Sequence, residues 1–569
     1  MELHFSKIYP QKWVQIVILF FFCLFLYFFN LGQWDLWNPD EPRYAEAARE
    51  MVNGGDWVLM HFNGKIYEDK PPLFFWLIGL ASSLFGGFSS FSVRFPSALF
   101  GTLTVLLTFF IGGSLYTSRT GFLSGLILAT SLGVFRFSTR ANMDTTLTFF
   151  TTASIFCFIE WYQNRPPHPS PLPQGERDRV RVDPLPPGER EWVSGRGWIY
   201  GFYVAMALAT LTKGPVGFIL PLLVSLIYLT FQRDWEAIRR MRLVRGILLL
   251  LVIALAWYLP AVLKGGQEYL RATLLHQSLD RFAEGTSHIR PFYFYFYNFP
   301  VDFLPWIFFL PGALAYGFSG EATGKRKEFL FLFVWFAVIF LFFSISKGKR
   351  GLYLLPLFPA VSIMVGKVWD DFVSGSMERF EREWISFSLY AMIGLALVGG
   401  AAVPWVVSVK FPSYLSHSLP MAFLMVGSSL ALSVLNRFKH YGAVLFLIVG
   451  IMAGGYLYAL RVVFPLVNPY KSARFISQEI SARRGPSERL AIYENFGTGP
   501  YNYYTGIVPI LEMENPEELF RFLESEDRVF CILKSRNLLR LQQTEAMPKV
   551  QLVAKRRVGD KEIVVISNR

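Results

Sequence analysis

The chain has 569 residues, of which 53% are hydrophobic and 17% charged, and long uncharged stretches recur between Val14 and Val463. Soluble globular proteins have about 45–50% apolar residues and few such stretches, so the composition excludes a soluble fold and predicts an integral membrane protein. The net charge of +13 would suggest a nucleic-acid partner in a soluble chain, but in a membrane protein basic cytoplasmic loops explain it, and no nucleic acid is expected.

The first expected element is a membrane-spanning helix near 14–30. Lys7 and Lys12 precede an apolar stretch that ends at Phe29, as they would in a signal peptide. The following residues, 30–34, contain no small-x-small cleavage site. We therefore interpret the stretch as an uncleaved first helix with the N-terminus in the cytoplasm.

A spanning helix needs roughly 20 apolar residues. The chain offers about thirteen such segments, near 14–30, 93–116, 120–136, 144–162, 197–212, 215–231, 245–263, 298–318, 329–345, 351–369, 385–409, 420–436 and 441–463. Segment 73–88 is apolar but interrupted by Gly86 and Gly87, so we expect a short interfacial helix there.

Basic residues test this topology, because cytoplasmic loops carry an excess of Lys and Arg. With residue 1 in the cytoplasm, the predicted cytoplasmic loops hold Arg119; Arg233, Arg239, Arg240, Arg242 and Arg245; Lys325, Arg326 and Lys327; and Arg437 and Lys439. An odd number of spans then puts the C-terminal tail outside.

Two basic clusters break this rule, because they fall at span ends on the outer side. One is Lys213, and the other contains Lys347, Lys349 and Arg350. An anionic ligand would explain cations there. The alternative is that these side chains snorkel to lipid phosphates.

Residues 165–196 are rich in Pro, Gly, Glu and Arg, and PLPQGER at 171–177 nearly repeats as PLPPGER at 184–190. Such a segment has too little apolar surface to fold alone. It is interpreted as a disordered cytoplasmic insertion, a neutral insertion rather than a binding module.

The chain is divided into a transmembrane domain at 1–463 and a soluble domain at 464–569. In the tail, 471–483 and 516–525 look helical, whereas 489–493, 529–533 and 562–567 look like short strands. This alternation predicts a small α/β domain outside the membrane. Nothing in it suggests catalysis, and we expect it to cap the outer face.

The first outer loop, 31–72, is expected to hold the catalytic residues. It contains Asp40 and Glu41 directly before a helical run, and adjacent carboxylates near a membrane are costly unless they are solvated or used. The alternative is ordinary capping, with Asp40 at the helix N-cap and Glu41 in the first turn.

Six short motifs occur in one order along the chain: DEPRY at 40–44, DKPP at 69–72, RFPSA at 94–98, MD at 143–144, TKGP at 212–215 and SKGK at 346–349, followed by LLPLFP at 354–359. The series resembles the bacterial glycosyltransferases that modify lipid A with aminoarabinose. It is also similar to the wider family of dolichyl-phosphate-mannose protein mannosyltransferases. The resemblance covers roughly residues 10–365 and extends less securely into the tail.

The resemblance implies a GT-C fold, that is, an α-helical polytopic membrane protein, here with a small extracytoplasmic α/β domain, in the bacterial inner membrane. The donor would be a polyprenyl-phosphate sugar and the acceptor lipid A or another lipid or glycan on the periplasmic side. Transfer would invert the anomeric centre. The absence of Rossmann and P-loop signatures fits a donor that is not a nucleotide sugar.

The implied chemistry needs a carboxylate, because an acceptor hydroxyl that attacks an anomeric carbon needs a general base. Asp40 is the first candidate. If the acceptor is a phosphate, Asp40 would instead orient the sugar or a metal. The candidate catalytic residues are Asp40, Glu41 and Asp144, with Arg43 and Tyr44 positioning the substrate.

The leaving lipid phosphate develops negative charge, which cationic side chains stabilise. The candidates for this role are Lys70, Lys213, Lys347, Lys349 and Arg350.

A divalent metal, Zn²⁺ or Mg²⁺, is a further expectation. The residue before Lys70 is commonly Glu in the family, where the aminoarabinose branch associates it with a metal and a later histidine. Here it is Asp69, and the later outer loop offers His276 and His288. The alternative is that these histidines are structural or hydrogen-bonded, as dispersed histidines more often are.

Two other functions remain open from the sequence. One is transfer to protein hydroxyls, as in O-mannosylation. The other is a transporter or flippase for lipid-linked sugars, although the internal repeats and broken helices usual in transporters are not evident in the sequence.

Overall fold

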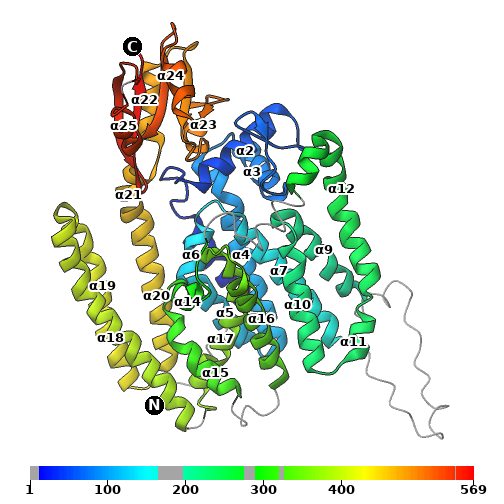
Figure 1. Ribbon diagram of the computed structural model, residues 1–569. Coiled ribbons are helices and arrows are strands. Elements are labelled where there is room, and N and C mark those ends of the chain that lie inside the picture. Colours follow the sequence, from blue (N-terminus) through cyan, green and yellow to red (C-terminus); the bar gives the residue numbers. More distant parts are fainter. Residues whose placement is uncertain (1–11, 165–195, 274–288, 319–325, 378, 545) are drawn as a thin grey trace, which may run out of the picture.

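The computed structural model describes residues 12–164, 196–273, 289–318, 326–377, 379–544 and 546–569. A bundle of helices forms most of the molecule, and a small sheet lies beyond one end of it, beside the C-terminus (Figure 1). The predicted insertion, except its last residue, and the candidate metal ligands His276 and His288 fall outside these ranges.

Every predicted span coincides with a helix or with consecutive helices. These are α1 (Lys12–Phe28), α4 (Ser90–Leu115), α5 (Ser118–Thr130) with α6 (Leu132–Ser138), α7 (Met143–Gln163), α9 (Arg196–Lys213), α10 (Val216–Phe231), α12 (Leu243–Arg271), α14 (Phe294–Asp302) with η3 (Trp306–Phe309) and α15 (Leu310–Phe318), α16 (Arg326–Ile345), η4 (Gly351–Leu357) with α17 (Phe358–Ser374), α18 (Arg379–Lys410), α19 (Leu415–Arg437), and α20 (Tyr441–Tyr458) with η6 (Ala459–Val463) and α21 (Phe464–Lys471).

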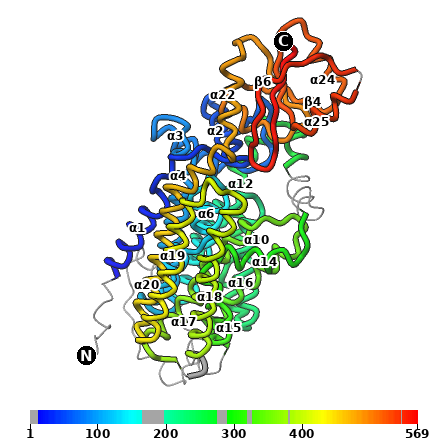
Figure 2. The backbone as a smooth tube through the Cα atoms, turned by 90° about the vertical axis from the view of Figure 1, so that its left-hand side faces the viewer, coloured from blue at the N-terminus to red at the C-terminus, as the bar shows by residue number. Residues whose placement is uncertain are grey.

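By length and composition, seven helices of the described residues could cross a membrane, or nine if each bent pair is one span, beside three shorter apolar helices. The mostly helical, multi-pass membrane architecture is therefore as predicted. The number of about thirteen spans stays a prediction. The continuous helical segment from α20 to α21 crosses the predicted domain boundary at 464 and leads to the C-terminal domain (Figures 1 and 2).

Two spans are bent, which was not expected from the sequence. The chain turns by 66° between α5 and α6 and by 111° between α14 and the η3–α15 segment. The two breaks lie against each other and are joined by hydrogen bonds. Leu132 N donates to Leu304 O at 3.1 Å, and Trp306 Nε1 donates to Thr130 Oγ1 at 3.0 Å. Irregular backbone at membrane depth needs such protein partners, because lipid offers none.

The first outer loop folds into α2 (Asp40–Gly54), a short hairpin of β1 (His61–Phe62) and β2 (Lys65–Ile66), and α3 (Leu73–Leu84). Apolar residues recur along one face of α2, where Tyr44, Ala48 and Met51 are buried against Phe74 and Phe75. The predicted short helix in 73–88 is thus present and forms the support of α2.

The C-terminal domain has a five-stranded sheet in the order β4-β3-β5-β7-β6, with parallel pairing of β3 to β4 and β5 and antiparallel pairing of β7 to β5 and β6. Its elements are α22 (Arg474–Arg483), β3 (Arg489–Tyr493), α23 (Gly499–Thr505), β4 (Leu511–Met513), α24 (Pro516–Leu523), β5 (Val529–Lys534), α25 (Ser535–Leu541), β6 (Gln551–Val558) and β7 (Lys561–Ser567). The predicted strands correspond to β3, β5 and β7, and the predicted helices to α22 and α24. The polar strand β6 and the three-residue β4 were missed.

Polar contacts fix this domain to the first outer loop. Asn63 is buried between them: its Oδ1 accepts from Asn502 Nδ2 at 2.9 Å and from Ile510 N at 2.7 Å. On the other side of the loop, Arg474 pairs with Asp35 at 3.1 Å. The domain therefore has a defined position over the outer end of the bundle.

Candidate functional site

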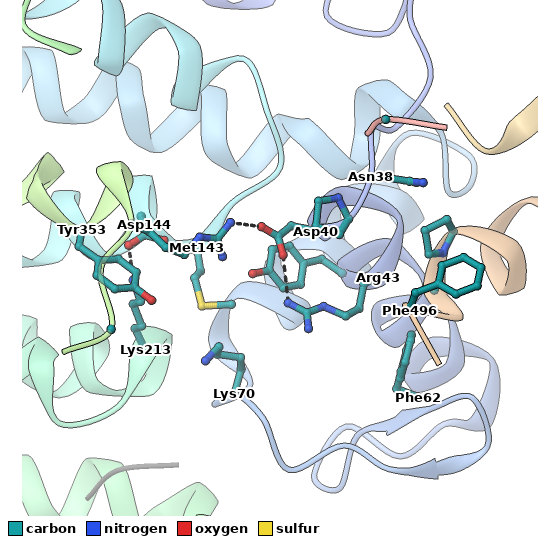
Figure 3. Close-up of a pocket in the computed structure, with 18 of the residues that line it drawn as sticks. Asn38, Asp40, Arg43, Phe62, Lys70, Met143, Asp144, Lys213, Tyr353 and Phe496 are labelled. Carbon is teal, nitrogen blue, oxygen red and sulfur yellow. Dashed lines mark hydrogen bonds and ion pairs between the residues drawn. The ribbon is translucent and has the colours of Figure 1, made fainter. Parts of the chain in front are cut away.

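A cavity of about 1150 Å³ lies where the first outer loop, the bundle and the C-terminal domain meet. Seven of the predicted site residues line it: Asp40, Arg43, Tyr44, Lys70, Asp144, Lys213 and Arg350. Figure 3 shows Asp144, Lys213 and Tyr353 on one side, Phe62 and Phe496 on the other, and Asp40 and Arg43 between them.

Asp40 is held between two guanidinium groups. Arg43, one turn later in α2, donates to Oδ1 at 3.1 Å, and Arg350, from the start of η4, pairs with Oδ2 (Figure 3). The N-cap of α2 is Pro39, and no side chain caps this helix. The structure therefore does not support the capping alternative for Asp40, because the carboxylate of Asp40 faces the cavity and pairs with two cations.

Arg43 connects this pair to the rest of the loop. Its Nη1 lies 3.6 Å from Asp69, and its guanidinium lies 5.4 Å from the ring centre of Tyr44. Burial alone would lower the pKa of Arg43, but the neighbouring Tyr67, Tyr44 and Asp40 raise that pKa above its ordinary value. Arg43 stays cationic in this site at any physiological pH.

A second carboxylate–cation pair lies across the cavity. Asp144 is in the first turn of α7, whose N-cap Asn142 accepts from the amides of Asp144 and Thr145 at 3.1 Å. Lys213 is the last residue of α9. The chain reverses at the next residue, Gly214, which has a φ of +83°. The Nζ of Lys213 pairs with Asp144 and lies 4.0 Å from the ring centre of Tyr353 (Figure 3).

Glu41 does not line the cavity. Its carboxylate accepts from Arg94 Nε at 2.7 Å and Nη2 at 2.9 Å, and from the amides of Trp37 at 2.9 Å and Ala141 at 2.8 Å. Burial would raise its pKa, but Arg94 holds the pKa below the ordinary value. The structure thus separates Glu41 from Asp40: Glu41 joins α2, α4 and the loop before α7 behind the site.

Two predicted phosphate ligands also lie elsewhere. Lys347 and Lys349 line a separate cavity of about 470 Å³ between α14 and α16. Lys349 is buried and donates to the carbonyls of Ser346 and of Arg290, the latter at 3.3 Å, and burial lowers its pKa. Arg350 is the member of this basic cluster that the structure brings to Asp40.

Two walls of the large cavity were not predicted from the sequence. One is apolar, with Val216 and Ile219 from α10 and Phe342 and Phe343 from α16. The other comes from the C-terminal domain: Lys471, Asn495, Phe496, Gly497, Thr498, Gly499, Pro500, Tyr501, Val558, Gly559, Asp560, Lys561 and Ile563. Gly499 packs so closely on Arg43 that an added Cβ would meet its Cα at 2.9 Å. In the sequence, this wall is marked only by a glycine-rich turn at 497–499, in a segment whose apolar residues do not recur at helix or strand spacing.

The predicted metal site is only partly within the described residues. Asp69 lies beside Arg43, as above, whereas His276 and His288 fall outside the described ranges. Among the residues that the structure describes, no group of three His, Cys, Asp or Glu side chains could hold a metal ion. A bound divalent metal stays a prediction.

Known proteins match this chain over different lengths. The family model of dolichyl-phosphate-mannose-protein mannosyltransferases matches residues 12–264. An undecaprenyl phosphate-alpha-4-amino-4-deoxy-L-arabinose arabinosyl transferase of Aeromonas hydrophila is 32% identical over 387 residues, which is 66% of this chain and 64% of that protein. The chain thus aligns with slightly less than two thirds of that relative. An uncharacterised protein of Aquifex aeolicus is 28% identical over 83% of this chain and 82% of its own length.

The crystal structure of the aminoarabinose transferase ArnT from Cupriavidus metallidurans bound to undecaprenyl phosphate shares the fold. It superposes with a TM-score of 0.78 at 22% identity and covers 98% of both chains, the C-terminal domain included. The motifs, the family model, the relatives and the fold agree: over most of its length the chain is similar to membrane glycosyltransferases, among them protein mannosyltransferases and aminoarabinose transferases.

Proposed function

We propose that the protein transfers a sugar from a polyprenyl-phosphate donor to lipid A, or to another lipid or glycan acceptor, on the periplasmic side of the bacterial inner membrane. The observation that carries this proposal is the placement of Asp40 between Arg43 and Arg350 in a cavity that also holds the Asp144–Lys213 pair. Carboxylates for a sugar and cations for a phosphate are both required by this reaction.

The donor fits the side of the cavity next to α10 and α16. The apolar wall of Val216, Ile219, Phe342 and Phe343 suits the first units of a prenyl chain. Lys213 lies beside this wall, and Lys70 and Arg350 also line the cavity. These three cations would bind the phosphate and stabilise the charge that it gains as the bond from anomeric carbon to phosphate oxygen breaks.

The acceptor must approach the anomeric carbon from the face opposite the leaving phosphate, because the transfer inverts that centre. A hydroxyl acceptor passes its proton to a carboxylate as the new bond forms, and Asp40 is the group we assign. Both oxygens of Asp40 are bonded to arginines in this state, so a donor phosphate that attracts Arg350 would free Oδ2 to act as base. A phosphate acceptor would need no base, and Asp40 would then orient the sugar.

The cavity is large enough for two substrates, since pockets for a single small ligand measure roughly 300–1,000 Å³ and this one is about 1150 Å³. Its location also supports the orientation of the chain. The basic helix α11 (Trp235–Arg240) lies at the end of the bundle away from the C-terminal sheet (Figure 1). With that end in the cytoplasm, the cavity and the C-terminus face the periplasm and the N-terminus faces the cytoplasm.

The test is mass spectrometry of lipid A, surface glycans and envelope proteins from cells that produce the wild type, Asp40→Asn, or Asp527→Asn. The last is a matched control, because Asp527 is exposed in the C-terminal domain outside the cavity. A sugar mass that is present with the wild type and Asp527→Asn and absent with Asp40→Asn supports the proposal and names the acceptor. No sugar-dependent difference in any fraction, with all three proteins in the membrane, would refute it.

A further inference from the structure

The C-terminal domain contributes to the cavity wall a polar group that makes no hydrogen bond within the described residues. Thr498 is 1% exposed, lines the cavity, and its Oγ1 makes no hydrogen bond within the described chain. Asn38, on the first outer loop, also lines the cavity, and its buried Oδ1 likewise lacks a partner among the described residues. A buried polar atom without a hydrogen bond lowers the stability of the fold. Two such atoms in the wall of one cavity therefore point to a ligand that supplies the missing hydrogen bonds.

The charge of this wall is mainly positive. Its charged residues are Lys471, Lys561 and Asp560, two cations against one anion. Lys561 Nζ lies 5.4 Å from the ring centre of Phe496, and Lys534 Nζ approaches the same ring at 5.3 Å. Both cations lie over the face of Phe496, which holds positive charge at this wall and suits it to an anionic group of a ligand.

This wall is separate from the donor side. Figure 3 shows Phe496 and Asn38 on the side of Asp40 and Arg43 that is away from Asp144, Lys213 and Tyr353. A sugar bound near Asp40 would therefore have the donor phosphate on one side and the domain wall on the other, which is the arrangement that an inverting transfer needs.

The domain is positioned firmly enough to take part in binding. Lys65 pairs with Glu512 at 2.9 Å, and Asn63 bonds both Asn502 and Ile510, so the loop of Asp40 and the wall of Thr498 are held together. Binding groups that are fixed in advance lose less entropy when the ligand binds.

We propose that Asn38, Thr498, Lys471 and Lys561 form the acceptor subsite, and that it binds the phosphorylated sugar headgroup of a glycolipid. Asn38 and Thr498 hydrogen-bond the sugar, and the two lysines bind its phosphate. This inference rests on the proposed function for its place in the reaction, but the binding that it asserts is measurable without transfer.

The experiment uses the full-length protein in detergent and two probes, bisphosphorylated lipid A and the same lipid after dephosphorylation. Lys561→Gln and Thr498→Val are compared with the wild type and with Lys555→Gln, a matched control on β6 whose side chain pairs with Glu562 outside the cavity. We expect Lys561→Gln to weaken binding of the phosphorylated lipid by about tenfold or more and to leave the dephosphorylated lipid unaffected, since hydrogen bonds to charged groups are the strong ones.

Thr498→Val keeps the shape of the side chain and removes only the hydroxyl, and it should weaken binding of both lipids by a similar, smaller factor. In transfer assays both substitutions should raise the KM for acceptor and leave the KM for donor unchanged. Equal binding of both lipids by wild type and Lys561→Gln overturns the inference, as does tight binding of a Ser/Thr peptide in place of the lipid. If these binding changes occur but no polyprenyl-phosphate sugar is consumed, the subsite stands and the proposed transfer fails.

Discussion

Asp40 and Glu41 are neighbours in the sequence and have opposite environments. Asp40 lines the cavity and pairs with two arginines whose own side chains are 28–30% exposed. Glu41 is 4% exposed, pairs with the fully buried Arg94, and accepts four hydrogen bonds, two of them from backbone amides. Consecutive residues at a helix start point about 100° apart, so one faces the cavity and the other the core.

Asp40 is thus the carboxylate to which we assign a chemical role, whereas the contacts of Glu41 are those of a structural group. Four hydrogen bonds leave Glu41 no capacity for a substrate, and removal of either partner would leave a buried charge uncompensated. The ligands of Asp40 are cations that a phosphate can attract away. An acidic pair in a sequence motif therefore does not imply two catalytic groups.

The largest effect is expected for Asp40→Asn. It should lower kcat by about 10²–10⁴-fold, the usual contribution of a general base, and leave thermal stability in detergent nearly unchanged. The measurement is steady-state transfer with purified protein and a polyprenyl-phosphate sugar, with Asp527→Asn as control. An activity loss that merely follows a loss of folded protein would contradict the separation of the two roles.

Arg94→Met should have the complementary effect. Because it leaves Glu41 charged and buried without its partner, we expect a loss of about 3–5 kcal/mol of stability, seen as a much lower unfolding temperature and a lower yield of folded protein. The double substitution Glu41→Gln/Arg94→Met removes the uncompensated charge and should recover part of this loss. Arg94→Met protein with wild-type stability and no activity would place Glu41 in the chemistry after all.

Much of the fold was predictable because its signals are local. Uncharged runs of helix length mark the membrane helices, and β-branched and apolar runs mark β3, β5 and β7. Strand β6 was missed because it carries Lys555, Arg556 and Arg557 on exposed positions at the sheet edge, where charge hides the alternation. The bends near Ser131 and Pro305 were missed because each depends on contacts with the other.

The site was predictable in part. The motifs identified Asp40, Lys70, Asp144 and Lys213, and the basic cluster identified Arg350; all five line one cavity. The motifs and the cluster could not separate Glu41 from Asp40 or Lys349 from Arg350, because the direction of adjacent side chains depends on tertiary partners. The domain wall of Thr498 and Lys561 was not predictable, since no local pattern tells which loop of a small α/β domain faces a cavity.

Lys213→Met extends the comparison to the second ion pair of the cavity. We expect the KM for donor to rise by about 10–100-fold, because a charged hydrogen bond to the phosphate is lost, with a much smaller effect on the KM for acceptor. Lys347→Met is the matched control: Lys347 is exposed and lies outside the large cavity. An equal rise in donor KM for Lys347→Met would restore the sequence prediction that Lys347 binds the phosphate.

Glu46, a third carboxylate of α2, has an environment intermediate between those of Asp40 and Glu41. It is buried and bonds Arg49 at 2.5 Å, but its Oε1 has no partner within the described chain. Arg49 also donates to the carbonyls of Tyr503 and Asn502, at 3.1 and 3.0 Å, so this pair lies at the contact with the C-terminal domain.

Burial raises the pKa of Glu46 to about 7, against the opposing effect of Arg49. A carboxyl whose pKa is higher in the folded than in the unfolded state destabilises the fold as it ionises, so stability should fall as the pH rises from about 4.5 to 7 and then level off. Glu46→Gln should flatten this dependence and stabilise the protein at pH 8 by on the order of 2 kcal/mol. The check is the unfolding temperature of both proteins between pH 5 and 8, and parallel curves would show that Glu46 is ionised throughout, as Glu41 is.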